Sequence, residues 1–262
     1  MRLIYGLLMM FGFDPVKCWN ALRGLPVYFA ERRRFRKAAS AGGGSAFPFG
    51  TPYPCLADRY EASGAAKGHY FHQDLLVARR IHSAAPERHI DVGSRIDGFV
   101  AHVASFREIE VVDIRPLPSN IPNVKFTQAD FMKPLPDTLR ECCDSVSCLH
   151  AIEHFGLGRY GDPIDPEGWR KGLDNLKTML KPGGLLYLSV PIGPTRIEFN
   201  AHRVYSVAFM LDRLVADFEL ERFSYVDDAG DLHEDVAVVG EDAENSFGCR
   251  YGCGIFELKK IG

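Results

Sequence analysis

The feature that most constrains the fold is a regular alternation of short apolar runs and helical patterns between residues 88 and 190. The apolar runs cover residues 88–93, 109–113, 124–127, 144–149 and 184–190, and helical patterns occur at residues 99–106 and 169–180. Strands that alternate with helices pair in parallel, because each helix carries the chain back to the start of the next strand. The pattern therefore predicts an α/β fold with a mainly parallel sheet and helices on both faces.

Further elements are predicted on either side of this region. Apolar residues recur at helical spacing within residues 65–82, which indicates a helix that covers one face of the sheet. Residues 220–226 and 254–258 indicate two more strands, which we expect to form a closing antiparallel pair.

The composition of residues 41–64 divides the chain into three parts. Glycines and a serine at residues 41–45 are followed by a proline-rich patch, which is typical of a linker. We predict an N-terminal helical arm at residues 1–40, a linker and proline-rich segment at 41–64, and a Rossmann-like domain at 65–262. With 46% hydrophobic residues, the chain of 262 residues can bury a core for such a domain.

The arm begins with an apolar run that Asp14 interrupts, well short of the roughly 20 residues that a membrane span needs. A dense basic run follows at residues 31–37. One interpretation is a helix docked on the domain with a solvated basic end. The other is a peripheral membrane anchor, whose apolar residues enter the lipid while its arginines meet anionic headgroups.

Charge and cysteine content narrow the partners and the compartment. A net charge of -3 gives no electrostatic basis for binding nucleic acid, so we expect none. Seven cysteines is an odd number, and the adjacent Cys142 and Cys143 suit reduced thiols better than a disulfide framework. Cys249 and Cys253 lack a matching second pair, so we interpret them as thiols and not as a metal site. These features predict a cytoplasmic protein, peripheral to the inner face of a membrane if the arm is an anchor.

Three acidic residues follow successive predicted strands: Asp91, Asp113 and Asp130. Ligands of parallel α/β sheets bind outside the carboxyl ends of the strands. Asp113 comes about 20 residues after Gly93, the spacing at which an acid reaches the hydroxyls of a ribose. Asp130 could accept a hydrogen bond from an adenine amino group. Acids at strand ends often only cap the next helix, but the order of these three predicts a cofactor that contains a nucleoside.

Several motifs resemble those of class I S-adenosylmethionine-dependent methyltransferases: D-V-G-S, V-V-D-I, Q-A-D-F, L-H-A-I-E-H and L-K-P-G-G-L-L-Y-L-S-V-P. A more detailed resemblance, over residues 68–262, is to a methyltransferase-like group known as domain of unknown function 268. It is carried by H-Y-F-H-Q-D-L, D-V-G-S-R-I-D-G-F, H-F-G-L-G-R-Y-G-D-P and F-N-A-H-R. The resemblance implies a Rossmann-like methyltransferase fold with a mainly parallel seven-stranded sheet and a closing antiparallel strand. It also implies S-adenosylmethionine as the cofactor.

The residues expected to bind this cofactor follow the first four strands: Asp91, Gly93, Ser94, Arg95, Asp113, Asp130 and His150. The glycine loop departs from the usual G-x-G-x-G of the resembling family, because Gly93 is followed by Ser94 and Arg95. Cβ atoms therefore line a loop where close approach of the cofactor is expected. Arg95 could bind the carboxylate of the methionine part or a substrate phosphate, or it could pair with Asp97 and only shape the loop.

Methyl transfer to a hydroxyl needs an oriented acceptor and a group that takes the proton. The candidate catalytic residues are His154, Glu153 and His202. His154 is preferred, because the E-H pair after strand four faces the cofactor in the resembling family and imidazole titrates near neutral pH. A structural hydrogen bond is its alternative role. His154, Asp162 and Asp165 are ligand types that suit a divalent ion, but their spacing does not demand one, so no metal is predicted.

Residues 154–169 are more than a plain connection needs, which is about 2–6 residues. We expect an ordered lid or an acceptor-site loop. The candidate substrate-binding residues lie in it and after strand five: Arg159, Tyr160, Asp162, Asn200 and Arg203. Arg159 and Arg203 could clamp a phosphate or the diphosphate of a sugar nucleotide. The aromatic residues of the loop could stack on a sugar or a base, or pack against its underside.

Together these features predict an S-adenosylmethionine-dependent O-methyltransferase that acts on a polar small molecule or on a glycan or sugar-nucleotide intermediate. The alternative from another class is a non-catalytic, methyltransferase-like binding or scaffold protein. The difference between the loop after Gly93 and the usual G-x-G-x-G favours this alternative. A nucleotide-sugar or dinucleotide enzyme is a third interpretation, and the K-P-G-G passage into strand five argues against it.

Overall fold

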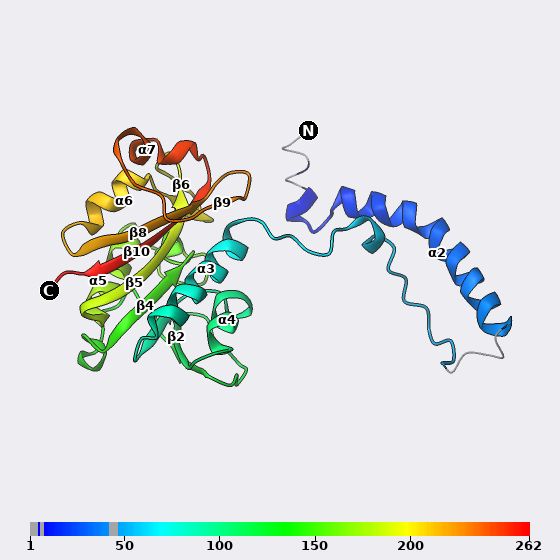
Figure 1. The fold of residues 1–262 in the computed structure, drawn as a ribbon, viewed down its shortest axis with the longest axis horizontal. Coiled ribbons are helices and arrows are strands. Elements are labelled where there is room, and N and C mark those ends of the chain that lie inside the picture. Colours follow the sequence, from blue (N-terminus) through cyan, green and yellow to red (C-terminus); the bar gives the residue numbers. More distant parts are fainter. Residues whose placement is uncertain (1–4, 6–7, 42–46) are drawn as a thin grey trace. The chain divides into compact units, whose positions relative to one another are not determined.

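The computed structural model describes residues 5, 8–41 and 47–262 of the chain (Figure 1). The chain forms two compact units, residues 1–65 and 66–262, which are described separately.

In the first unit a long helix, α2 (Pro15–Ala41), precedes a short 3-10 turn, η1 (Asp58–Tyr60). Asp14 caps the helix, because its Oδ1 accepts hydrogen bonds from the backbone N–H groups of the second and third residues after it. Gly24 is buried, and a Cβ at this position would lie 1.9 Å from the carbonyl oxygen of Leu56. The proline-rich segment therefore packs against the helix where the helix has no side chain.

The apolar side chains of α2 are spread around the helix instead of forming one face. Trp19, Leu22 and Phe29 are among those exposed. Within residues 5, 8–41 and 47–262, no helix combines the length and the apolarity that crossing a membrane requires.

The second unit contains an eight-stranded sheet in the order β3-β2-β1-β4-β5-β10-β8-β9. Its strands are β1 (His89–Val92), β2 (Ile109–Asp113), β3 (Val124–Gln128), β4 (Cys143–Leu149), β5 (Leu180–Ile192), β8 (Phe218–Val226), β9 (Leu232–His233) and β10 (Gly252–Lys260). The first five strands pair in parallel, whereas β10 is antiparallel to both β5 and β8, between which it lies (Figure 1). The predicted mainly parallel methyltransferase-type sheet is confirmed, with one strand more than the seven expected.

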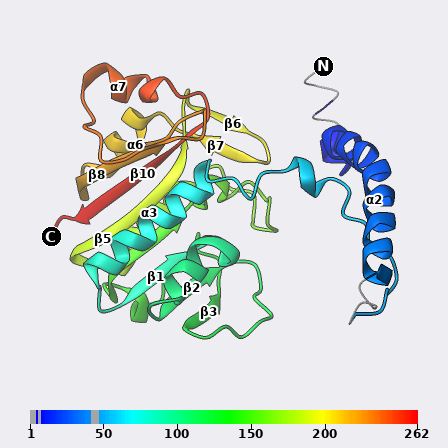
Figure 2. The same ribbon diagram turned by 45° about the vertical axis from the view of Figure 1, so that its right-hand side comes forward.

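Helices cover both faces of this sheet. The helices of the unit are α3 (His69–Ala84), α4 (Ala101–Ala104), α5 (Gly168–Met179), α6 (Val207–Leu214) and α7 (Gly240–Glu244). Buried side chains of α3 and α4 pack with Ile109 and Val111 on one face, along which Figure 2 shows α3 lying. Those of α5 and α6 pack with Ile90 and Val112 on the other face. Alternate residues of one strand thus face opposite layers, as the period of a β-strand requires.

The remaining elements are short: η2 (Ile96–Val100), η3 (Asp137–Leu139), η4 (Ile152–His154), η5 (Ser246–Gly248) and the β6 (Arg196–Glu198)–β7 (His202–Val204) hairpin. The helix expected at residues 99–106 begins earlier, in the π-helical turn η2. Helix α6 was not predicted, although the hydroxyl of Ser206 accepts a hydrogen bond from the N–H of Phe209 as an N-cap does.

Candidate functional site

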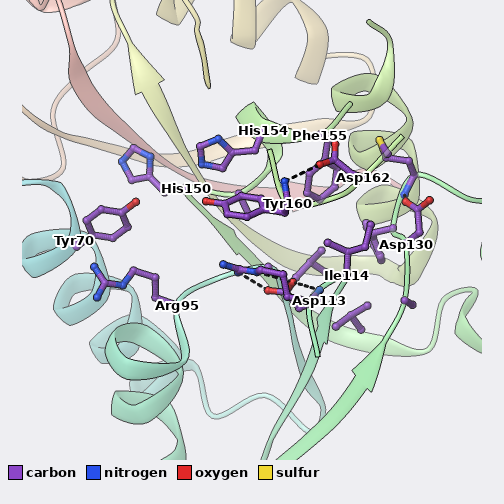
Figure 3. A pocket seen from close by; sticks show the side chains of 18 residues that line it. Tyr70, Arg95, Asp113, Ile114, Asp130, His150, His154, Phe155, Tyr160 and Asp162 are labelled. Atoms are coloured by element: carbon purple, nitrogen blue, oxygen red, sulfur yellow. Dashed lines mark hydrogen bonds and ion pairs between the residues drawn. The ribbon is translucent and has the colours of Figure 1, made fainter. Parts of the chain in front are cut away.

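A cavity of about 220 Å³ opens where β1, β2, β3 and β4 end (Figure 3). Figure 3 shows Tyr70 and Arg95 on one side of it, Asp130 on the other, and His154 and Tyr160 between them. The side chains that line it come from all four strand ends, α3 and the loop after η4: Tyr70, Val92, Gly93, Arg95, Val112, Asp113, Ile114, Arg115, Ala129, Asp130, Phe131, Met132, His150, Ala151, His154, Phe155, Tyr160 and Asp162. This is the sheet edge at which the sequence predicts a ligand.

Asp91 and Ser94, two of the predicted cofactor ligands, lie behind the cavity wall and not on it. The Asp91 carboxylate accepts hydrogen bonds from the hydroxyls of Ser147 (2.5 Å) and Ser94 (2.6 Å) and from the Ser94 N–H (3.0 Å). Burial raises the pKa of Asp91 to about 7 in spite of these donors. The Ser94 hydroxyl also accepts from the Leu149 N–H at 3.1 Å. The prediction is corrected for both residues, since they hold the β1 loop against β4.

Gly93 and Arg95 of the same loop do line the cavity. Gly93 has φ +74, and a Cβ there would lie 2.9 Å from the Cβ of Ala151. Both the left-handed backbone and this close contact therefore disfavour a side chain at position 93. Arg95 makes the two-pronged pair with Asp97 that the sequence left open, at 3.0 and 2.8 Å, and its guanidinium lies 4.9 Å from the ring centre of Tyr70. Because the Arg95–Asp97 pair is exposed, it stabilises little and can open for an anionic ligand.

Asp113 also lines the cavity, but Arg115 already contacts its carboxylate. The guanidinium of Arg115 donates to Oδ1 at 3.0 Å and to Oδ2 at 2.6 Å, and its backbone N–H donates to Oδ1 at 2.8 Å. The same guanidinium lies 4.4 Å from the ring centre of Tyr160. Asp113, Arg115 and Tyr160 therefore connect the end of β2 to the loop after η4.

The end of the cavity near Asp130 is lined by apolar side chains. Val112, Ile114, Phe131 and Met132 line it. Oδ1 of Asp130 accepts a hydrogen bond from the N–H of Met132 at 3.0 Å. Oδ2 lies 3.9 Å from the ammonium of Lys133, beyond hydrogen-bond distance, so it can still accept from a further donor. Apolar walls with one carboxylate oxygen suit a flat heteroaromatic ring that carries an amino group.

His150 lies at the opposite end, with a left-handed backbone (φ +49) and a buried ring. Its Nδ1 lies 2.7 Å from Oε1 of Glu153, and its Nε2 lies 3.1 Å from Nδ1 of His69. Burial lowers the pKa of His150, but Cys253 and Glu153 outweigh burial and hold that pKa well above its usual value. Burial, together with the charge of His150, lowers the pKa of His69 to about 4. Protonated His150 therefore donates to Glu153 and to neutral His69.

His154 lines the cavity in the protonation state that a base needs. Its Nδ1 lies 2.6 Å from the carbonyl oxygen of Ala201, so Nδ1 carries the proton and donates it. Burial lowers the pKa of His154, so the ring is neutral at pH 7 and Nε2 keeps its lone pair. The Glu153 carboxylate lies 3.7 Å from this Nε2, behind the cavity lining. Burial raises the pKa of Glu153, but the charge of His150 and its hydrogen bond outweigh burial and keep the group ionised.

The loop after η4 is ordered by Asp162 and Arg203, both predicted to bind substrate. The Asp162 carboxylate accepts from the N–H groups of Gly156 (2.8 Å), Gly158 (3.2 Å) and Tyr160 (3.1 Å), while its side chain still borders the cavity. Arg203 is buried, and its guanidinium donates to the carbonyl oxygens of residues 153 (3.3 Å), 155 (2.7 Å) and 166 (3.3 Å). The prediction is corrected for Arg203, because its donors hold the loop and do not face a substrate.

Three other predicted residues lie outside the lining of the cavity. Nε2 of His202 lies 3.0 Å from Oε2 of Glu198 and outside the cavity, so the prediction that His202 is catalytic is corrected. Asn200 is exposed, and Arg159 is exposed with its guanidinium 2.8 Å from the carbonyl oxygen of Ala201. Their assignment to substrate therefore requires a ligand larger than the cavity.

Sequence reasoning did not assign roles to Tyr70, Arg115, His69 and Cys253. His69 and Tyr70 begin the motif H-Y-F-H-Q-D-L, and their place at the N-terminus of α3 was the available signal. Arg115 follows Asp113 by two residues, a spacing compatible with a turn. In the sequence, Cys253 stands out only by its short spacing from Cys249. Across residues 5, 8–41 and 47–262, the one group with convergent metal-ligand atoms is His69, His150 and Cys253.

The strand order, with an antiparallel strand between β5 and β8, and a cavity at the ends of β1–β4 define a Rossmann-like methyltransferase fold. The fold resembles a chain of the complex between the Haloferax volcanii Trm112 methyltransferase activator and a methyltransferase. That match has 13% identity and a TM-score of 0.50, over 74% of this chain and 90% of that chain. Identity this low shows the fold alone.

Two further matches have lower TM-scores. The 1,6-didemethyltoxoflavin-N1-methyltransferase of Burkholderia thailandensis, solved with S-adenosylhomocysteine, has 15% identity and a TM-score of 0.49 over 72% of this chain and 79% of that chain. The N-methyltransferase NodS of Bradyrhizobium japonicum, also solved with S-adenosylhomocysteine, has 13% identity and a TM-score of 0.46 over 74% and 89%.

A protein-family model described as Caenorhabditis protein of unknown function, DUF268, matches residues 123–237. This is the group to which the motifs of the sequence point, and the match confirms that resemblance. The matched residues include the loop after η4 and Arg203, which holds it. No curated protein matches the chain.

Proposed function

We propose that the chain is an S-adenosylmethionine-dependent methyltransferase that transfers a methyl group to a hydroxyl of a polar small molecule. The observation that carries the proposal is one cavity bounded by Gly93 at the end of β1, Asp113 at the end of β2 and Asp130 after β3. These positions suit an approach of the backbone, a vicinal diol and an amino-purine, in that order along the sheet edge.

The residues present fit this cofactor. Oδ2 of Asp113 accepts only one hydrogen bond from Arg115, so the carboxylate keeps lone pairs for a ribose diol. The apolar far end with Asp130 suits the adenine. Arg95, held only by an exposed pair, suits the carboxylate of the methionine part.

When bound, the cofactor supplies a methyl group on a positively charged sulfur. The chain contributes position and proton transfer, because an in-line displacement depends on the orientation of the acceptor. His154 holds its Nε2 lone pair at the cavity and takes the acceptor proton, while the carbonyl oxygen of Ala201 fixes the tautomer. Glu153 stabilises the imidazolium that results.

The acceptor is proposed to lie between His154 and the two tyrosines Tyr70 and Tyr160. Figure 3 shows the hydroxyls of these tyrosines pointing toward one another. A sugar or sugar-nucleotide acceptor remains the proposal for the finer class, with Arg159 and Asn200 contacting a part that extends beyond the cavity. The predicted clamp of Arg159 and Arg203 on a phosphate is excluded from this proposal, because Arg203 is buried in the loop.

A transfer assay tests the proposal. The chain is incubated with methyl-labelled cofactor and a panel of hydroxylated metabolites, sugars and sugar nucleotides. We expect labelled product, and we expect His154→Ala to keep cofactor affinity while losing turnover by about 100-fold or more. His202→Ala is the matched control and keeps turnover. Unchanged turnover in His154→Ala would remove it as the base.

One observation favours a second candidate, a binding protein without transfer activity: Arg115 occupies the carboxylate that a ribose would use. Binding of the cofactor with no turnover on any acceptor, together with equal affinity for a bound acceptor in wild type and His154→Ala, would support this candidate.

For the first unit we propose peripheral contact with the inner face of an anionic membrane. The exposed Trp19, Leu22 and Phe29 and the basic run at residues 31–37 support it. In a flotation assay, the full chain should move with anionic vesicles, and a chain without residues 1–40 should not. Equal flotation of both forms would contradict the proposal.

A further inference from the structure

Three side chains of metal-ligand type converge beside the cavity from distant parts of the sequence. His69 begins α3, His150 follows β4, and Cys253 lies in β10. Their ligand atoms all lie within 4.8 Å of one another. His150 and Cys253 are buried and His69 is half-buried, so the group is shielded from water on most sides.

The spacing of the nitrogens suits one shared ion. Nδ1 of His69 and Nε2 of His150 are 3.1 Å apart. Two nitrogens bound tetrahedrally to one zinc ion are separated by about 3.3 Å, because each Zn–N bond is about 2.0–2.1 Å. The two rings are parallel, with an interplanar angle of 2°. A proton on His150 Nε2 can be donated to one neighbour at a time, whereas an ion at that point contacts both imidazoles and the thiol.

The surroundings supply the support that zinc-binding histidines usually have. Nδ1 of His150 lies 2.7 Å from Oε1 of Glu153, the carboxylate–histidine arrangement that fixes the tautomer and directs Nε2 toward a metal. Without an ion, the Cys253 thiol donates to Oε1 of Gln73 at 3.6 Å, and this oxygen also accepts from the Ser189 hydroxyl at 2.6 Å. Cys253 gives up this proton when it binds an ion, so the contact that supports a ligand in the bound state is the one between Glu153 and His150.

A divalent cation would preserve the charge balance of this buried group. Glu153 is 1% exposed, and within the described residues its Oε2 has no hydrogen-bond partner. A buried carboxylate needs positive charge close by, which the His150 ring supplies while it carries both of its protons. An ion bound in this place displaces one proton from His150 and one from the Cys253 thiol, and its two positive charges then balance the carboxylate and the thiolate. Two imidazoles and one thiolate are ligands that zinc prefers over magnesium or calcium.

We infer that His69 Nδ1, His150 Nε2 and Cys253 Sγ bind one zinc ion beside the cavity, with the fourth position open. Three protein ligands with an open position are the arrangement of catalytic zinc, which keeps a place for water or a substrate oxygen. Because His150 also lines the cavity, the ion lies at its wall. The inference does not depend on the cofactor or on methyl transfer.

Metal content tests the site directly. The full chain is purified from zinc-supplemented medium, dialysed against metal-free buffer and measured by elemental mass spectrometry. We expect about one zinc per chain in wild type, and a loss of most of it in Cys253→Ala and in His69→Gln. Cys249→Ala is the matched control, because this buried thiol lies four residues from Cys253 outside the group, and it should keep the zinc. Far-ultraviolet circular dichroism checks that each variant is folded.

Cobalt gives a second readout that separates a ligand from a merely structural residue. Co²⁺ added to metal-free wild type should produce thiolate-to-cobalt charge-transfer absorption, which disappears in Cys253→Ser and persists in Cys249→Ala. Glu153→Gln should keep this absorption but weaken zinc affinity by about 10- to 100-fold. Wild type with no zinc above the level of Cys253→Ala, or a charge-transfer band unchanged in Cys253→Ser, would overturn the inference.

Discussion

Replacement of Gly93 by alanine tests whether the end of β1 must approach the next loop as closely as the structure shows. Gly93 has φ +74, and a new Cβ would lie 2.9 Å from the Cβ of Ala151. The left-handed backbone costs a non-glycine residue about 1–2 kcal/mol. Overpacking at the contact adds about 1–3 kcal/mol. We therefore expect Gly93→Ala to lower the free energy of unfolding by about 2–5 kcal/mol.

Gly161→Ala is the matched control for this prediction. Gly161 has φ +81, but a Cβ there meets nothing within 4 Å. Both variants share the backbone cost and the entropy that alanine removes from the unfolded chain, so these effects cancel in the comparison. Urea unfolding followed by circular dichroism should place Gly93→Ala about 1–3 kcal/mol below Gly161→Ala. Equal stabilities would refute the close approach of Gly93 and Ala151 as the reason for a glycine.

Three further predictions concern residues around the cavity. Arg203→Met should lower the free energy of unfolding in urea by about 2–4 kcal/mol, because it leaves buried carbonyl oxygens without a donor; exposed Arg159→Met should change it little, and equal effects would contradict the assignment. Asp162→Ala should speed proteolysis within residues 154–169, since three N–H groups lose their acceptor; cleavage at the wild-type rate would show that the carboxylate does not order the loop. Burial lowers the pKa of His89 to about 3, whereas the pKa of this side chain in the unfolded protein is near 6.5. The stabilising contribution of neutral His89 is therefore complete above about pH 6.5 and is lost as the pH falls below it. The difference in unfolding free energy between wild type and His89→Gln should decrease by roughly 1.4 kcal/mol per unit between pH 6 and 4, and a difference independent of pH would contradict it.

The parallel strands were predictable because each is a short apolar run bounded by turn residues, and the apolar side chains alone place them in the sheet. The sequence also placed Asp113 and Asp130 at the edge where ligands bind, and both line the cavity. Position along a strand indicates which face of the sheet a side chain points to, but it does not identify the side chain's partners, so the sequence alone did not exclude Asp91 as a cofactor ligand. The register of β1 with β4 sets Asp91 opposite Ser147, and that pairing joins residues far apart in sequence.

Long-range contacts explain the other corrections as well. Arg203 resembles a substrate ligand in sequence, and only the folded loop shows that its donors meet backbone carbonyl oxygens. The convergence of His69 with Cys253 depends on α3 and β10 meeting at one end of the sheet. No local spacing pattern connects two residues so distant in the chain, so the sequence predicted no metal.

Isothermal titration with S-adenosylhomocysteine and S-adenosylmethionine tests whether Asp113 and the cavity around it bind this cofactor. We expect wild type to bind both ligands and Asp113→Ala to lose affinity by about 100-fold or more, because two charge-assisted hydrogen bonds contribute about 1.5–3 kcal/mol each. Asp137→Ala, at an exposed position away from the cavity, is the control and should bind as wild type does. Absence of heat with either ligand up to about millimolar concentration, or equal affinities in wild type and Asp113→Ala, would contradict this assignment of the cofactor site.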